Sequence, residues 1–274
     1  MKLPRLRTVL LAPFAVFAML YIAAALKLAT DDTSVSAFDG VAADYGTIAI
    51  FGASGTAGDG ILEAALANPV IGKIHVITRR VTPRMEEGES SGKVRITLHD
   101  DYLDYTAVRG QIAEADAVFW AIGISSVGID EKTYGTIHVD FPMRFVEEWL
   151  SSSEKPDISF HYISSSDISE DSSAMWAREK VRAEKSLFAF ARGTKLRVIA
   201  YRPDYIGPTD EDAQLGQKLL YGFFAPVGVA VKATQIGQAM MEVTARGPEF
   251  SNGDKLGTRN IVRYSDAYEA GREK

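Results

Sequence analysis

Short apolar runs alternate with amphipathic stretches along most of this chain. Each run holds several consecutive apolar or β-branched residues, which is typical of a strand buried on both faces of a sheet. Such runs predict strands at 47–51, 73–78, 94–99, 117–122, 158–163 and 196–201. Helical spacing of apolar residues predicts helices over 61–68, 106–114, 141–150, 173–191, 210–224 and 234–246. Because strands and helices alternate, the pattern predicts an α/β fold, with a doubly wound parallel sheet covered by helices on both faces.

The N-terminal end of the chain does not follow this pattern. Residues 8–26 form an apolar run after Lys2, Arg5 and Arg7, and a helix of this length, at about 1.5 Å per residue, can cross a bilayer. We therefore predict that residues 1–28 form a single hydrophobic helix that anchors the chain in a membrane through residues 8–26. A cleaved signal segment is the alternative.

Composition removes several function classes. The net charge is −6 and no basic patch is interleaved with aromatic residues, so nucleic-acid binding has no support. The chain has no cysteine, and its four histidines show no paired metal-ligand spacing, so the sequence predicts no metal site.

The first strand of the main domain leads into a glycine-rich turn. Gly52, Gly55 and Gly58 stand between this strand and the following helix, with Ser54 and Thr56 among them. Glycines let the backbone approach a ligand closely, and a helix N-terminus offers free N–H groups to a pyrophosphate. The turn predicts a dinucleotide site in a Rossmann-type fold, with a merely tight structural turn as the alternative.

This site divides the chain. Residues 29–46 are interpreted as a polar linker and 47–208 as the NAD(P)-binding Rossmann domain. Residues 209–274 are interpreted as substrate-side helices and a last strand of the same domain, ending in a charged surface tail. The charge before the apolar run places this domain on the far side of the membrane, whereas nicotinamide cofactors are most abundant in the cytosol, so its side stays open.

The ends of the next strands supply further cofactor candidates. Arg79 and Arg80 stand where a carboxylate would hold the ribose of NAD(H), and a guanidinium there favours the 2′-phosphate of NADP(H). Two solvated arginines at a loop start are the alternative. Asp101 is placed to accept from an adenine amino group, although Asp also starts turns, and Tyr102 or Leu103 would lie against the ring. Ala121 and Gly123 leave room for the ribose and nicotinamide.

Residues after the fifth strand are the candidates for catalysis. Ser164 leaves that strand, and Trp176 and Lys180 share one face of the following helix. This order resembles the atypical, NAD(P)-binding branch of the short-chain dehydrogenase/reductase superfamily over residues 47–208. The resemblance rests on the glycine turn, Arg79, Asp101, the block from Ser164 to Lys180, and Arg202-Pro203. It is closest to the Tat-interacting-protein, oxidoreductase-like branch, which shares Gly-Ala-Ser-Gly at 52–55 and Val139-Asp140.

The resemblance implies roles and exposes a departure. It implies that Ser164 orients a substrate carbonyl and that Lys180 holds the cofactor ribose, both as catalytic residues. The superfamily's proton-donating Tyr corresponds to Trp176, and an indole N–H does not ionise usefully. Asp204 is a second departure, because Gly is common there. One interpretation is an oxidoreductase for an unknown carbonyl or alcohol substrate, with its proton from water, Tyr205, Tyr134 or the substrate. The other is a non-catalytic cofactor-binding regulator, redox sensor or scaffold.

Overall fold

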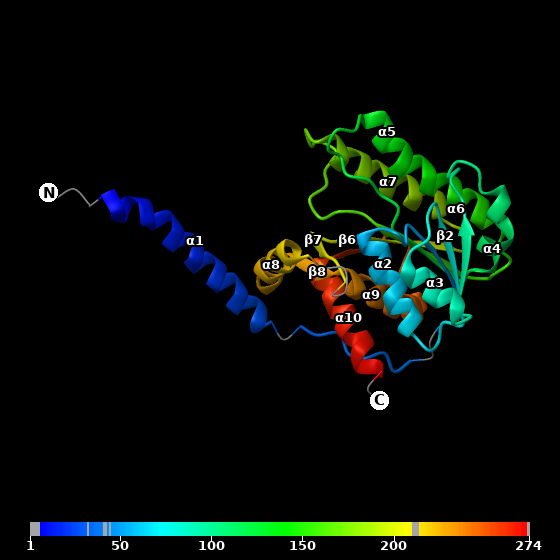
Figure 1. The fold of residues 1–274 in the computed structure, drawn as a ribbon, viewed down its shortest axis with the longest axis horizontal. Coiled ribbons are helices and arrows are strands. Elements are labelled where there is room, and N and C mark those ends of the chain that lie inside the picture. Colours follow the sequence, from blue (N-terminus) through cyan, green and yellow to red (C-terminus); the bar gives the residue numbers. More distant parts are fainter. Residues whose placement is uncertain (1–5, 32, 41–42, 44, 210–213, 273–274) are drawn as a thin grey trace.

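A parallel sheet lies at the centre of the protein (Figure 1). The computed structural model describes residues 6–31, 33–40, 43, 45–209 and 214–272, with side chains of the first helix from Pro13 onward. Within these residues the main sheet has seven strands in the order β3-β2-β1-β4-β5-β6-β9, and every neighbouring pair is parallel. The strands are β1 Thr47–Phe51, β2 Lys73–Thr78, β3 Val94–Leu98, β4 Ala117–Trp120, β5 Ile158–Ile163, β6 Leu196–Arg202 and β9 Lys255–Gly257. The predicted doubly wound α/β fold is therefore confirmed.

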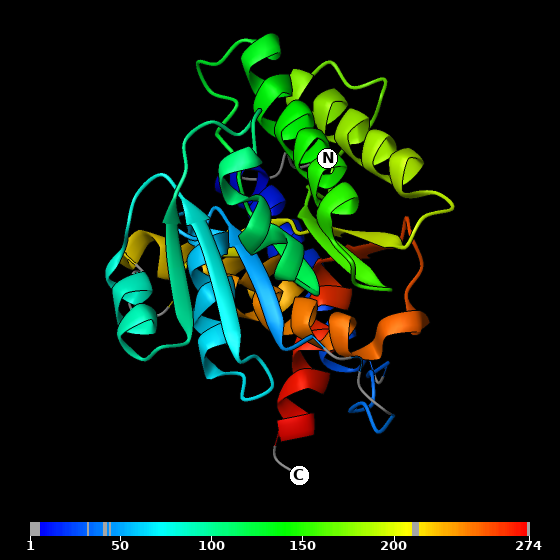
Figure 2. The same cartoon turned by 90° about the vertical axis from the view of Figure 1, so that its right-hand side faces the viewer.

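Helices cover both faces of the sheet (Figures 1 and 2). One face carries α2 Thr56–Ala67, α9 Ala233–Arg246 and α10 Thr258–Arg272; the other carries α4 Arg109–Glu114, α6 Phe141–Ser152 and α7 Met175–Ala191. Side chains of a strand alternate between these faces, so Ile48 and Ile50 belong to the first core and Ala49 and Phe51 to the second. The strands read as continuous apolar runs because both of their faces are buried.

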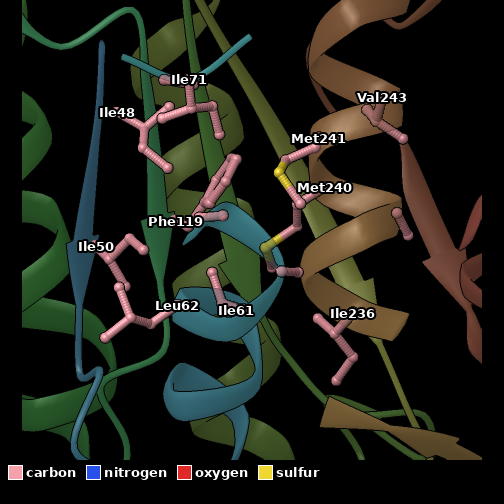
Figure 3. Packing of buried hydrophobic residues seen from close by; sticks show 14 of the residues in the cluster. Ile48, Ile50, Ile61, Leu62, Ile71, Phe119, Ile236, Met240, Met241 and Val243 are labelled. Atoms are coloured by element: carbon pink, nitrogen blue, oxygen red, sulfur yellow. The ribbon is translucent and has the colours of Figure 1, made fainter. Parts of the chain in front are cut away.

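Close packing of α2 on α9 fixes the helix that follows the glycine turn. In Figure 3, Ile61 and Leu62 of α2 lie between the sheet and Met240 of α9. Glycines permit this approach, since a Cβ at Gly60 would lie 2.3 Å from the carbonyl carbon of Ala233. The helix predicted over 234–246 is confirmed as α9, whose inward face buries Ile236, Ala239, Met240 and Val243.

Two surface segments differ from the prediction. No helix was predicted between the strands at 73–78 and 94–99, but this segment contains α3 Pro83–Ser90, because Pro at a first helical position favours a helix start and Met85 packs into the core. The charged tail belongs to α10, which buries Ala267 and Tyr268 on the sheet side. In both α3 and α10, charged residues on one face of the helix made its apolar face difficult to recognise in the sequence. A two-stranded sheet of β7 Tyr205–Gly207 and β8 Ala230–Lys232 was also not predicted.

The predicted membrane anchor at residues 8–26 is wrong. The apolar run lies in α1 Leu6–Ala29, which extends away from the body in Figure 1. In the described part of the chain, however, no helix is both long and apolar enough to cross a membrane. Part of α1 packs on α8 Leu215–Phe224 instead: the Tyr21 hydroxyl donates to the Phe223 carbonyl at 2.7 Å, and the two rings stack at 5.2 Å. Hydropathy along the chain does not distinguish a spanning helix from one whose apolar side chains contact another helix.

Candidate functional site

A groove runs along the carboxyl ends of the central strands, where the strand order reverses between β1 and β4. Open sheets of this kind bind ligands at that point. The groove has two adjoining parts, of about 460 and 510 Å³, which share Gly55, Ala121 and Gly123. We call the first the arginine groove; it is lined by Gly52, Ser54, Gly55, Thr78, Arg79, Arg80, Tyr102, Ala121, Ile122 and Gly123. We call the second the lysine groove; its lining includes Thr56, Tyr134, His138, Ser164, Trp176, Lys180 and Asp204.

The three glycines of the turn serve different purposes. Gly52 has a φ of +80°, and a Cβ there would lie 2.6 Å from the Ala121 carbonyl. A Cβ at Gly58 would lie 2.1 Å from the Gly52 carbonyl oxygen. At Gly55, by contrast, φ is −102° and the nearest atom to a Cβ is 3.5 Å away. Gly52 and Gly58 are required by the chain itself, whereas nothing in the described chain requires a glycine at position 55.

The glycine turn leads directly into the N-terminus of α2. Gly55 is the residue before the helix, and no side chain of the described residues caps its first turn. Thr56 and Ala57 of that first turn line the lysine groove. The helix start therefore presents its positive dipole end and uncapped N–H groups beside the groove.

Two arginines border the arginine groove from the end of β2. Both side chains are exposed, and Arg80 Nη2 donates to the carbonyl oxygen of Ser54 at 3.0 Å across the glycine turn. Tyr102 is buried and packs edge-on against Phe51, with its pKa raised mainly by desolvation. Asp101 is absent from the groove lining; its carboxylate accepts from the Leu103 N–H at 3.0 Å, as a turn-starting residue does.

Ser164 and Lys180 come together in the lysine groove. The Ser164 N–H extends the sheet by donating to the Tyr201 carbonyl at 2.7 Å, which directs the residue to the end of β5. Its Oγ is buried and has no hydrogen-bond partner among the described residues. Lys180 Nζ donates to the Ile163 carbonyl at 2.9 Å and to the Tyr162 hydroxyl at 3.3 Å. Trp176 lies half-buried in the same lining, in the first turn of α7.

Burial dominates the electrostatics around Lys180. Desolvation lowers the pKa of Lys180 to about 7, and the charge of Glu184 offsets only part of this effect. Glu184 does not contact the ammonium, because it accepts from Arg202 Nε at 2.9 Å and from Arg202 Nη2 at 2.5 Å. The Tyr162 hydroxyl donates to the His138 carbonyl at 3.0 Å, and burial raises its pKa well above the usual value.

Sequence reasoning missed His138, which was interpreted as a helix residue without a functional role. It lies in a π-helical turn, Thr136–Asp140, and such turns occur frequently at functional sites. Its ring is 4.1 Å from the Tyr134 ring, and its Nδ1 is buried without a partner among the described residues. Desolvation and the nearby Lys180 charge lower its pKa to about 3. No sequence signal marks this residue, because its position depends on the π-helical turn.

Two other candidates occupy different positions. Tyr205 is in β7, packs against Phe224 at 5.9 Å, and is absent from the lining of the lysine groove. Asp204 lies in that lining, but its carboxylate accepts from the Thr258 hydroxyl at 2.7 Å. Of the two tyrosines considered as proton sources, Tyr134 therefore borders the lysine groove and Tyr205 does not.

Comparison with known proteins identifies the fold. No protein-family profile matches the chain. It resembles an oxidoreductase of the short-chain dehydrogenase/reductase family from Burkholderia thailandensis, with a TM-score of 0.63 and 13% identity over 80% of this chain and 93% of that one. It also resembles a 3-oxoacyl-[acyl-carrier protein] reductase from Brucella melitensis in complex with NAD, with a TM-score of 0.61 and 15% identity over 81% and 98% of the two chains. The chain therefore has the fold of Rossmann oxidoreductases of this family.

Two further similarities involve an epimerase and a relative that matches only part of the chain. A UDP-glucuronic acid 4-epimerase from Bacillus cereus in complex with NAD matches with a TM-score of 0.59 and 14% identity over 77% and 76% of the chains. Leucinostatins biosynthesis cluster protein T from Purpureocillium lilacinum is 26% identical over 137 residues. That match spans 49% of this chain and 49% of the relative, so only about half of either protein is compared.

Proposed function

We propose that this chain binds NADP(H) along the two grooves and transfers hydride between the cofactor and a carbonyl or alcohol substrate. The observation that carries the proposal is Gly55. A Cβ at this position would have room within the described chain, so packing inside the protein does not require a glycine there. A ligand that approaches the turn closely from the groove would explain the glycine. Structural relatives with the same fold, the Brucella reductase and the Bacillus epimerase, were crystallised with NAD.

The groove residues fit a dinucleotide along its length. The start of α2 offers N–H groups to a pyrophosphate, while Arg79 and Arg80 would hold a 2′-phosphate, which favours NADP(H) over NAD(H). Ala121 and Gly123 border both grooves, and Lys180 would hold the nicotinamide ribose. The unpartnered Oγ of Ser164 is a donor for a substrate carbonyl. When bound, the cofactor supplies the hydride.

A second function is favoured by one observation. Trp176 occupies the groove position where the resemblance places a proton-donating phenol. A protein that keeps the glycine turn and Lys180 but lacks this phenol can bind the cofactor without turning it over. It would then act as a cofactor-dependent regulator, redox sensor or scaffold, as the resemblance to the atypical branch of the superfamily also implies.

Substitution of Gly55 tests the nucleotide site. We expect Gly55→Ala to fold with unchanged thermal stability and to lose NADPH affinity by about 10-fold or more, since a methyl group would meet the ligand and not the chain. Gly110→Ala is the matched control, because its Cβ would meet nothing within 4 Å and Gly110 lies in α4, away from the groove. Calorimetric titration with NADPH and NADH measures both variants. Wild-type protein that binds neither nucleotide contradicts the proposal, and equal affinities in all three proteins contradict the role of Gly55.

A further inference from the structure

The lysine groove has Trp176 where the resemblance expects a phenol, so a reductase would need another proton donor there. Carbonyl reduction requires one proton on the substrate oxygen for every hydride on the carbon. Trp176 cannot provide it, because an indole N–H does not ionise near neutral pH. The donor must therefore be another group that reaches the groove, and the described lining offers few of them.

The phenols and the imidazole are unsuitable. Tyr162 contacts Lys180 but has no exposed surface, and its hydroxyl already donates to the His138 carbonyl. Tyr134 borders the groove without a hydrogen bond to its hydroxyl in the described structure, and burial with the charge of Glu179 raises its pKa to about 12. His138, with a pKa of about 3, carries no exchangeable positive charge at neutral pH. None of the three matches the acidity that efficient proton transfer requires.

Lys180 has both the position and a free N–H. An ammonium has three N–H donors, and two of them are used by the Ile163 carbonyl and the Tyr162 hydroxyl. The third has no partner among the described residues, and the side chain, which is 7% exposed, lines the groove beside Ser164. Among the described residues no carboxylate contacts the ammonium, and Glu184 is held by Arg202.

We propose that the ammonium group of Lys180 itself protonates the substrate oxygen, replacing the phenol that Trp176 excludes. This inference rests on the proposed reductase function, and in it the one free N–H of Lys180 goes to the substrate oxygen and not to the cofactor ribose. As hydride reaches the carbonyl carbon, the C=O π pair moves onto oxygen; the Lys180 N–H bond breaks, and the new O–H bond completes the alcohol. Lys180 is left as a neutral amine and takes its next proton from water. Ser164 orients the oxygen by donating its otherwise unpartnered hydroxyl.

The surroundings of Lys180 favour this cycle near neutral pH. The groups that face it are Tyr162 from β5, His138 from the π-helical turn, Glu184 on its own helix with Arg202 from β6, and Tyr134 and Asp204 across the groove. Tyr162 and His138 stay neutral, and the charge of Glu184, which is paired with Arg202, offsets only part of the effect of burial. Burial therefore determines the lysine pKa of about 7, at which both the acid and its conjugate base are well populated.

Direct titration tests the inference independently of turnover. In full-length protein with carbon-13 at lysine Cε, the Lys180 resonance is the one that Lys180→Arg removes. We expect its midpoint near pH 7, well below the ordinary lysine value of about 10.4. A midpoint above about pH 9 overturns the inference. Wild-type protein that fails to bind NADPH overturns the proposed function. A high Lys180 midpoint in protein that does bind NADPH overturns only the proton-donor inference, so the two failures are distinguishable.

Variants then separate proton donation from cofactor binding. Lys180→Arg keeps a cation with N–H donors but changes a buried residue that lines the cofactor groove, so the rate is measured at saturating NADPH, where weaker binding does not limit it. Under these conditions we expect a loss of about 100-fold or more in reduction of neutral quinones, aldehydes and ketones. Adding Trp176→Tyr to Lys180→Arg supplies a phenol, and we expect it to recover part of the rate. Retained reduction in Lys180→Arg overturns the inference. If the wild-type chain is inactive and Trp176→Tyr alone makes it active, the inference is also overturned.

Discussion

The Nζ atom of Lys180 lies 3.3 Å from the hydroxyl oxygen of Tyr162, a residue of β5 with no exposed surface. The lysine thus contacts a phenol inside the core, while the groove residue one helical turn before it is Trp176. Contact between a lysine and a phenol is present in this protein, but on the side away from the groove. This arrangement leads to the predictions below.

Removal of the buried hydroxyl is expected to change the titration of Lys180. Tyr162→Phe leaves the ammonium with one fewer partner and the His138 carbonyl without its donor, so we expect a loss of about 1–3 kcal/mol in the free energy of unfolding. The Lys180 midpoint should move lower, because a hydrogen bond to the charged form is lost. Urea unfolding and the carbon-13 titration measure the two effects.

Tyr201→Phe is the matched control for this experiment. Its hydroxyl bonds to buried His161 at 2.9 Å on the neighbouring strand, away from Lys180. We expect a comparable loss of stability with an unchanged Lys180 midpoint. Equal shifts of the midpoint in both variants would show that the Tyr162 contact has no specific effect.

The two arginines are expected to discriminate between cofactors. Arg79→Ala combined with Arg80→Ala should weaken NADPH by about 10- to 100-fold, the range expected for the loss of one hydrogen bond to a charged group at about 1.5–3 kcal/mol, and should change NADH affinity by less than about 3-fold. Arg95→Ala, an exposed arginine of β3 outside the groove, should change neither affinity. Calorimetric titration measures all affinities; parallel losses for NADPH and NADH in the double variant would contradict contact with a 2′-phosphate.

A methyl group at Gly58 is expected to disrupt the glycine turn. Its Cβ would lie 2.1 Å from the Gly52 carbonyl oxygen, so Gly58→Ala must move backbone, and we expect a loss of about 2 kcal/mol or more. Gly110→Ala, with open space around its Cβ, should be neutral or stabilising by up to about 1 kcal/mol. Thermal unfolding compares them. Gly58→Ala with wild-type stability would mean that the turn adapts without cost.

Buried His161 is expected to make the fold sensitive to acid. Burial lowers its pKa to about 3 from 6.5, so the unfolded chain binds the proton first and stability falls as pH drops below about 6.5. The slope from this residue approaches about 1.4 kcal/mol per pH unit. His161→Gln should be less stable at neutral pH, because bonds to Tyr201, Ser159 and Thr244 weaken, yet should lose less on acidification.

Ser159→Ala serves as the comparison for His161→Gln. It removes one hydrogen-bond partner of the ring and keeps the histidine. We expect reduced stability at every pH with the wild-type slope. Urea unfolding between about pH 7 and pH 4.5 measures the slopes, and identical slopes in wild type and His161→Gln would exclude His161 as a source of acid sensitivity.

The sequence by itself determined the features that depend on local order. Strands at 73–78 and 158–163 match β2 and β5 at both ends, because buried parallel strands are short apolar runs. The glycines at 52, 55 and 58 and the arginines at 79 and 80 follow β1 and β2 directly. Their meeting at one groove follows from the parallel arrangement, since the carboxyl ends of such strands share an edge.

Only the tertiary structure decided which of these residues act together. The helical turn that brings His138 to Lys180, the contact of Lys180 with Tyr162 and the packing of Tyr21 on Phe223 join residues distant in the chain. Such contacts leave no periodic signal, because each depends on how whole elements pack. The pKa of Lys180 likewise depends on burial by several elements, so the sequence could identify the lysine but not its acidity.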